Sequence, residues 1–186
     1  MTAITAANVL VIATNGFEQS ELEFPRDQLR AKGAKVHVAT LDGQSIKGWE
    51  GTDWGREAEA DLKIADAKAS DYDALVIPGG QINPDLLRVE ESVLSLVKDF
   101  HNSGKVIAAV CHGPWVLVEA GVAKGRDMTS FHSIKTDVIN AGANWQDAEV
   151  VTDKGIITSR KPDDLKAFVS KIVEEIEEGE HSRKAA

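Results

Sequence analysis

Nearly continuous apolar runs recur along the chain at "NVLVIA" (8–13), "DALVIP" (73–78) and "KVIAAV" (105–110). Such runs are typical of strands buried on both faces, because a strand with one exposed face alternates apolar and polar residues. The segment "KVHVATL" (35–41) does alternate, and it predicts a fourth strand. The pattern therefore predicts a parallel sheet that is covered by helices on both sides.

Amphipathic helices are predicted between and after these strands, where apolar residues recur at steps of three and four. Four segments have this pattern: 20–32, 90–103, 133–141 and 163–177. Gly104 provides a C-terminal cap for the second helix, and Pro162 fits the first turn of the last one. Pro25 must lie near the first turn of the helix at 20–32 or kink it.

The alternation of strands and helices predicts a three-layer α/β sandwich with a mainly parallel central sheet. Residues 149–159, "EVVTDKGIITS", predict a hairpin. No repeat or linker divides the chain, so we expect one domain over residues 1–186, with a flexible charged tail from about 178. The Gly- and Trp-rich segment 42–56 is either a surface loop or a pocket rim or oligomer contact.

Composition restricts the classes of function. The chain has 186 residues, of which 42% are hydrophobic and 27% are charged, as in an ordinary globular protein. A net charge of -9 argues against nucleic acid or an anionic membrane as a partner. The single cysteine excludes a disulfide framework and a multi-cysteine metal site, and we expect neither metal nor cofactor. The N-terminus shows no secretory signal and no apolar run approaches ~20 residues, so a cytoplasmic location is expected.

Ligands of open α/β sheets bind beside the carboxyl ends of the strands, so the residues that follow each predicted strand are candidates for a site. They include small residues, carboxylates, a thiol and an imidazole. The candidates are Gly16 and Glu18 after 8–13, Gly79, Gly80 and Asp85 after 73–78, and Cys111, His112 and Gly113 after 105–110. Their convergence on one edge of one sheet predicts an active site there.

Cys111 lies in "AVCHGPW" (109–115), directly after a predicted strand. Small residues two positions before and after it repeat the spacing of a nucleophile elbow, which is a sharp turn from strand to helix. Such a turn directs the backbone N–H of His112 and the start of the next helix at the thiol, and both favour the thiolate. The alternatives are a small core cysteine and a His112 that supplies only its backbone amide.

The other candidates each have a structural and a chemical interpretation. Gly80 could form a simple turn, or its amide could join that of His112 in an oxyanion hole. Glu18 could cap a helix, or it could be buried and protonated and hydrogen-bond the sulfur. Asp85 could cap the next helix, or it could orient the imidazole as the third member of a triad. His132 precedes a predicted helix and could also reach the site.

Several ordered segments together resemble the PfpI branch of the ThiJ/PfpI superfamily. They are "GFEQSE" (16–21), "DALVIPGGQINPDLLR" (73–88), "GKVIAAVCHGPWVLVEAGVAKGR" (104–126), "TDVINAGANWQDAEVVTD" (136–153) and "ITSRKPDDL" (157–165). The resemblance implies a flavodoxin-like fold related to class I glutamine amidotransferase domains. It also implies a homodimer or a higher homo-oligomer with the site near the subunit interface.

The resemblance further implies a role for each site residue. Cys111 is the nucleophile, Glu18 the buried carboxyl at the sulfur, and the amides of Gly80 and His112 the oxyanion hole. A histidine directly after the cysteine selects the PfpI branch. Asp85 best matches an acid that is donated across a subunit interface. Phe131 stands where some peptidase-type relatives have tyrosine, which is a departure from the peptidase pattern.

These implications lead to one expected function and two alternatives. We expect a cofactor-independent, cysteine-dependent stress enzyme that acts on methylglyoxal or on early glycation adducts of proteins or nucleotides. One alternative is an intracellular cysteine peptidase with a Cys-His-Asp/Glu triad. The other is an oxidative-stress sensor or holdase that uses an oxidisable cysteine.

Overall fold

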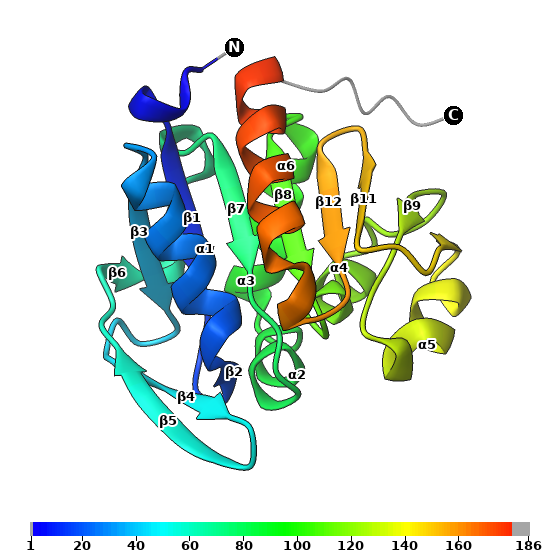
Figure 1. The fold of residues 1–186 in the computed structure, drawn as a ribbon, viewed down its shortest axis with the longest axis horizontal. Coiled ribbons are helices and arrows are strands. Elements are labelled where there is room, and N and C mark those ends of the chain that lie inside the picture. The colour runs from blue at the N-terminus through cyan, green and yellow to red at the C-terminus, as the bar shows by residue number, and fades with distance from the viewer. Residues whose placement is uncertain (1, 180–186) are drawn as a thin grey trace.

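The four predicted strands lie side by side in the central sheet of a computed structural model that describes residues 2–179 (Figure 1). The seven strands of this sheet, in spatial order, are β11 (Val150–Asp153), β12 (Ile156–Ser159), β8 (Val106–Val110), β7 (Ala74–Ile77), β1 (Asn8–Ile12), β3 (Lys35–Thr40) and β6 (Leu62–Lys63). Neighbouring strands are parallel except β11 and β12, which form the predicted hairpin at one edge. The carboxyl ends of β7, β8 and β12 therefore meet at the lower edge in Figure 1.

Alternate residues of the central strands fill two hydrophobic cores, one on each face of the sheet. On β1, Leu10 and Ile12 belong to one core, and Val9 and Val11 belong to the other. All four side chains are fully buried, and each such burial stabilises the fold by about 1.5–3 kcal/mol. The continuous apolar runs in the sequence thus reflect strands that are covered on both sides.

Helices cover both faces of the sheet, which confirms the predicted three-layer α/β class. Helix α1 (Gln19–Ala31) and helix α6 (Leu165–Glu178) pack on the face of Val9, and α3 (Glu91–Asn102) and α4 (Pro114–Glu119) pack on the face of Leu10. Figure 1 shows α1 and α6 in front of the sheet and α3 behind it. The short helices α2 (Ile82–Leu87) and α5 (Lys135–Asn140) lie beside the sheet ends.

The Gly- and Trp-rich segment is not a loop. It forms most of a β-hairpin of β4 (Ile46–Glu50) and β5 (Asp53–Ala58), and β4 also pairs with β2 (Phe17–Glu18). Trp49 and Trp54 face each other across the hairpin, edge to face, with ring centroids 5.5 Å apart. The Gln19 side chain packs against Gly48 on β4 and Gly55 on β5, where a Cβ would clash with it. These glycines interrupt the alternation of apolar and polar residues that would otherwise predict the two strands.

Other short elements lie outside the predictions or modify them. The predicted helix at 133–141 divides into a 3-10 turn at His132–Ile134 and α5. Strand β9 (Asp127–Met128) pairs with β10 (Asn144–Trp145) in a small second sheet. The remaining 3-10 turns are Ile4–Ala6, Ile64–Asp66, Ala69–Asp71 and Pro162–Asp164. Most of the predicted flexible tail, residues 180–186, lies outside the described residues.

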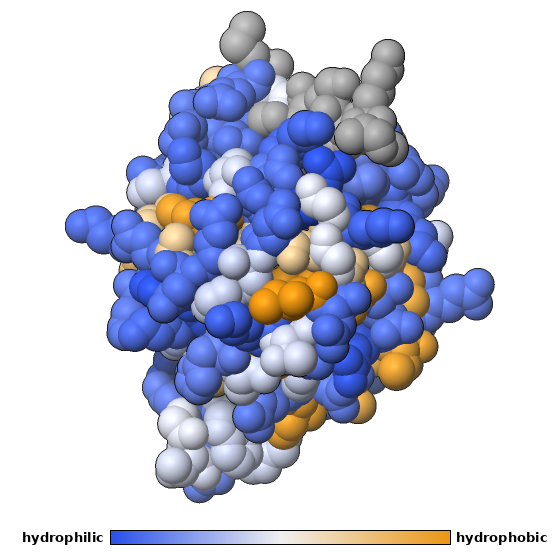
Figure 2. All heavy atoms as spheres, turned by 90° about the vertical axis from the view of Figure 1, so that its right-hand side faces the viewer, coloured by the Kyte–Doolittle hydropathy of each residue, from blue (hydrophilic) through white to orange (hydrophobic). Residues whose placement is uncertain are grey.

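The face of the molecule that Figure 2 presents is mainly polar. Figure 2 shows a largely hydrophilic face with small, separate hydrophobic patches. Within residues 2–179, no helix is both long and apolar enough to cross a membrane.

Candidate active site

Cys111 lies at the centre of a strained turn between β8 and α4. Its backbone φ is 63°, a left-handed value that is uncommon for residues other than glycine. Three backbone hydrogen bonds fix this conformation: Cys111 N–H donates to Ser159 O at 3.0 Å, Phe131 N–H to Cys111 O at 2.8 Å, and Gly113 N–H to Val110 O at 2.8 Å. The predicted elbow is therefore present, and backbone hydrogen bonds to the surrounding structure stabilise its strained conformation.

The loop after β7 brings Gly79 and Gly80 against the cysteine. The amides of Gly80 and His112 both lie close enough to the Cys111 sulfur to lower the pKa of its thiol. Gly80 has φ +81°, and a Cβ there would lie 2.8 Å from the nitrogen of Glu18, so this close approach requires glycine. Two backbone donors thus converge on the position where negative charge would develop during nucleophilic attack.

The buried carboxyl at the sulfur belongs to Glu21, and this corrects the prediction that placed Glu18 there. Glu21 is fully buried in the first turn of α1, and its Oε2 accepts a hydrogen bond from Gly79 N–H at 2.8 Å. Its carboxyl also lies within hydrogen-bonding reach of the Cys111 side chain. Glu18 directly precedes α1 and is only half-buried. Glu21 lies in the first turn of the helix, which directs its side chain toward the core.

Burial and the nearby Glu18 carboxylate raise the pKa of Glu21 from 4.5 to about 8. The carboxyl is therefore mainly neutral at pH 7. Its Oε1 is buried without a hydrogen-bond partner among the described residues, which also disfavours the charged form.

Burial also raises the pKa of the Cys111 thiol, and the Glu21 carboxylate adds to this effect while it is charged. The amides of Gly80 and His112 act in the opposite direction. A neutral Glu21 removes the repulsion and leaves the two amides to stabilise negative charge on the sulfur.

His112 is held at both ring nitrogens. Its Nδ1 lies 3.2 Å from Cys111 Sγ, and its Nε2 lies 3.1 Å from Ser133 Oγ. The ring stacks on Phe131, with centroids 4.9 Å apart, and meets Trp115 edge to face at 5.2 Å. Burial, followed by the charge of nearby His132, lowers the pKa of His112 from 6.5 to about 4, so the imidazole is neutral at pH 7.

Within one chain, Asp85 does not reach the imidazole. Its side chain is 54% exposed and pairs with Arg88 at 2.7 Å. The Arg88 guanidinium lies over the Trp115 ring, 4.7 Å from its centroid, and Trp115 in turn contacts His112. A role for Asp85 across a subunit interface stays a prediction, because the structure contains a single chain.

Phe131 also lines a cavity of about 240 Å³. The other residues around this cavity are Ser130, His132, Trp145, Asp147, Arg160 and Lys161. Both cations of the lining are paired with carboxylates: Arg160 binds Asp147 at 2.7 Å and Asp164 at 2.9 Å, and Lys161 binds Asp163 at 2.9 Å. The cavity is therefore polar, and it carries no unpaired cation.

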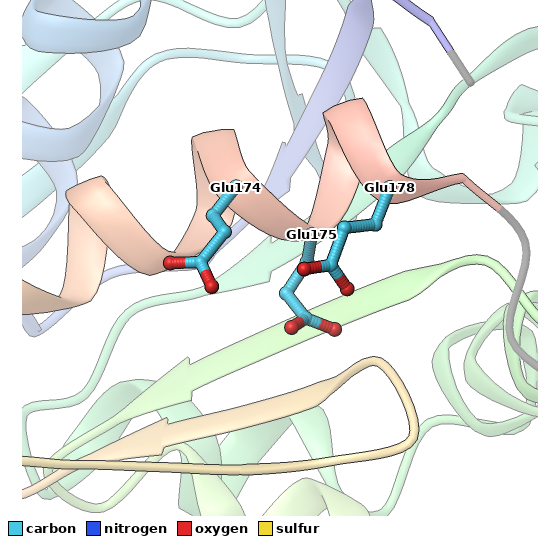
Figure 3. Close-up of side chains that lie close together, drawn as sticks. All are labelled: Glu174, Glu175 and Glu178. Carbon is cyan, nitrogen blue, oxygen red and sulfur yellow. The ribbon is translucent and has the colours of Figure 1, made fainter.

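A separate group of acidic side chains lies on α6. Figure 3 shows Glu174, Glu175 and Glu178 projecting from its C-terminal half, with ligand oxygens within 4.8 Å of one another. Glu174 already binds Lys171 at 2.8 Å. The group lies at the upper end of α6 in Figure 1, opposite the edge that carries Cys111, so it has no part in the thiol chemistry.

The arrangement can perform nucleophilic addition to a carbonyl. It has a thiol on an elbow, an imidazole nitrogen within hydrogen-bonding distance, two convergent amides and a neutral carboxyl. The sequence interpretation missed Glu21 and Ser133 as members of this group. Glu21 had a detectable signal, since positions 21, 25 and 29 share one helical face and the other two are Pro25 and Leu29.

Several known proteins are similar to this chain in sequence or in fold. The sequence model of the DJ-1/PfpI family matches residues 7–175. The Escherichia coli protein "Protein/nucleic acid deglycase 2" is 41% identical over 162 residues, which are 86% of this chain and 92% of that protein. A Bacillus subtilis relative named YraA, a proposed cysteine protease, is 42% identical over 161 residues, with 86% of this chain and 92% of the relative covered. The crystal structure of Drosophila melanogaster DJ-1beta superimposes with a TM-score of 0.82 and 34% identity, covering 92% of this chain and 94% of that one.

Proposed function

Because the chain belongs to the DJ-1/PfpI family, we propose that it is a cofactor-independent cysteine enzyme that removes reactive carbonyl groups. Its substrates in this proposal are methylglyoxal or the early adducts that methylglyoxal forms with proteins or nucleotides. The observation that carries the proposal is the geometry of Cys111, whose Sγ lies 3.2 Å from an imidazole nitrogen and close to the backbone amides of Gly80 and His112. The name of the Escherichia coli relative supports the substrate class.

The first chemical step is the addition of the thiol to a carbonyl carbon. Cys111 Sγ forms a bond to that carbon, and the carbonyl π electrons move to the oxygen. The thiol proton passes to His112 Nδ1, so the imidazole becomes an imidazolium. The amides of Gly80 and His112 stabilise the new oxyanion, which then takes a proton from the imidazolium to give a hemithioacetal.

Glu21 supports this step by remaining neutral. A charged carboxylate at this distance would oppose the negative charge that develops on the sulfur. A neutral carboxyl can donate a hydrogen bond to that sulfur instead. We therefore assign to Glu21 the role that the sequence interpretation gave to Glu18.

The burial of the thiol favours small or flexible substrates. Cys111 is only 6% exposed, so the rigid backbone of a folded protein cannot approach it closely. A dicarbonyl molecule, or an adduct at the end of a long side chain, can. The polar cavity at Phe131 offers space for the rest of such an adduct.

We also infer that the protein forms homo-oligomers through α2. Ile82, Leu86 and Val89 are exposed apolar residues at spacings of four and three, and they flank Asp85. A second subunit that covers them would lie near the active site. The unpaired thiol fits a reducing compartment, so a cytoplasmic location remains part of this proposal.

A cysteine peptidase is the second candidate, because the same nucleophile and oxyanion donors can attack a peptide carbonyl and YraA is named as a proposed protease. An oxidative-stress sensor or holdase is the third, and it requires no turnover. The deciding assay compares wild type and Cys111→Ser on methylglyoxal, on glycated amino acids and on unstructured peptides. Ser170→Ala, an exposed change on α6, is the control.

We expect methylglyoxal consumption and release of adducts by the wild type and the control, and loss of both in Cys111→Ser. Full activity of Cys111→Ser would overturn the mechanism. Thiol-dependent cleavage of peptides without action on carbonyls would establish the peptidase. Failure on every substrate, together with oxidation of Cys111 by mild peroxide and gain of client binding, would establish the sensor.

A further inference from the structure

Ser133 holds the side of the His112 ring that faces away from the thiol. Its Oγ lies 3.1 Å from His112 Nε2, whereas Nδ1 of the same ring lies 3.2 Å from Cys111 Sγ. The side chains of Cys111, His112 and Ser133 thus form a continuous hydrogen-bonded row within one chain. Neither the resemblance to the family nor the proposed function assigns a role to this serine.

The serine hydroxyl is not used by the helix that follows. A serine before a helix commonly caps it with its side-chain oxygen. Here the residue before α5 is Ile134, and α5 has no side-chain cap. Ser133 lies instead in the 3-10 turn that also contains His132 and Ile134, and this turn directs its hydroxyl at the imidazole.

We propose that Ser133 is a positioning residue for His112, which holds Nε2 and thereby directs Nδ1 at the Cys111 sulfur. The inference rests only on the Cys–His part of the proposed function and not on the identity of the substrate.

Hydrogen bonds, and not packing, must select the orientation of the ring. Phe131 and Trp115 fix the plane of the imidazole by stacking and edge contact. A half-turn about the Cβ–Cγ bond keeps that plane, but it exchanges Nδ1 with a carbon and moves Nε2 away from Ser133. The two hydrogen bonds distinguish these orientations, and loss of the serine hydroxyl leaves only the bond to sulfur.

A hydroxyl also suits an imidazole that must take up and release a proton. While Nδ1 accepts from the thiol, Nε2 carries the hydrogen and donates to Ser133 Oγ. If Nδ1 carries the hydrogen and donates to a thiolate, Ser133 O–H can donate to Nε2. A carboxylate accepts only, and its charge would raise the basicity of the ring.

The position of Ser133 changes the expectation for Asp85. A carboxylate from a partner subunit would need Nε2, because the sulfur engages Nδ1. Ser133 already engages Nε2, and Asp85 is paired with Arg88. The inference therefore predicts a small effect when Asp85 loses its charge and a larger one when Ser133 loses its hydroxyl.

The test measures the rate of alkylation of Cys111 by iodoacetamide at pH 7, followed by mass spectrometry of the full-length protein. Cys111 is the only cysteine, so a single modification reports on the site. The variants are Ser133→Ala, Ser133→Thr and Asp85→Asn. Ser133 is exposed, so its replacement is not expected to affect folding, and thermal unfolding checks this.

We expect Ser133→Ala to slow alkylation by about three- to tenfold, the effect of one hydrogen bond between neutral groups. Ser133→Thr, which keeps the hydroxyl, should recover most of the rate, and Asp85→Asn should slow alkylation less than Ser133→Ala does. With methylglyoxal, Ser133→Ala should lower kcat and leave KM nearly unchanged.

An unchanged rate in Ser133→Ala, or equal losses in Ser133→Ala and Ser133→Thr, would overturn the inference. A large loss of rate in Asp85→Asn with no loss in Ser133→Ala would also overturn it, and would show instead that the carboxylate of Asp85 orients the imidazole. The proposed function can fail separately: if alkylation depends on Ser133 but no carbonyl is consumed, the positioning role stands and the substrate is wrong.

Discussion

Replacing Glu21 with glutamine tests whether the buried carboxyl is held neutral. The change Glu21→Gln preserves shape, and the amide oxygen can still accept the hydrogen bond from Gly79 N–H. It removes only the ability to ionise. A carboxyl that is neutral in the folded protein and charged in the unfolded chain makes stability fall as pH rises, because folding then requires the uptake of a proton.

The magnitude follows from the two pKa values. The pKa of Glu21 is about 8 in the folded protein and 4.5 as its ordinary value. Below pH 4.5 the carboxyl is neutral in both states and has no pH-dependent effect. Between the two values each pH unit lowers the free energy of unfolding by about 1.4 kcal/mol, which gives a maximum of about 5 kcal/mol by pH 8.

The assay is urea unfolding of Cys111→Ser and of Cys111→Ser/Glu21→Gln at a series of pH values from 4 to 9. The serine background removes titration and oxidation of the thiol, and all other ionisable groups are common to both proteins. We expect the stability of the glutamate protein relative to the glutamine protein to fall steadily with pH. A difference that is constant from pH 5 to 8, or that rises with pH, would refute the assignment of a neutral Glu21.

Two further predictions concern the groups around the thiol. NMR titration of His112 should give a midpoint near pH 4, because burial lowers the pKa of the ring. Activity should be lost as the pH falls through this value, because protonation removes the base. A midpoint near 6.5 would contradict the effect of burial. Gly79→Ala places a Cβ 2.5 Å from Glu21 Oε2 and 2.6 Å from Cys111 Cβ, so it should cost more than about 2 kcal/mol in urea unfolding and slow alkylation of the thiol. Gly121→Ala is its control, since open space surrounds that position and only about 1 kcal/mol of backbone strain is expected; equal costs would contradict the steric argument.

The sheet was predictable because its strands carry a strong local signal. Strands buried on both faces are continuously apolar, and in an open α/β sheet the chemistry lies at their carboxyl ends. This reasoning located Cys111, His112 and Gly80 at one edge. The short strands and the hairpin at 46–58 were missed, because their pairing depends on contacts with Gln19 and β2 and not on their own alternation.

The choice between Glu18 and Glu21 shows where local reasoning failed. Both follow the first strand, but the sequence segment and the resemblance to the family led to Glu18 alone. The deciding fact is that α1 begins at Gln19 and turns position 21 inward. Ser133 could not be found in this way, because its partner lies 21 residues earlier and the 3-10 turn that aims its hydroxyl has no clear sequence signal.

The left-handed backbone at Cys111 limits which nucleophiles evolution could try at this position. With φ at 63°, a β-branched side chain would clash with its own backbone, so threonine is not a route to an oxygen nucleophile. Serine has no such branch, and aspartate tolerates this conformation better than most residues. The turn that presents the thiol to a substrate therefore also restricts which nucleophilic side chains can replace cysteine at this position during evolution.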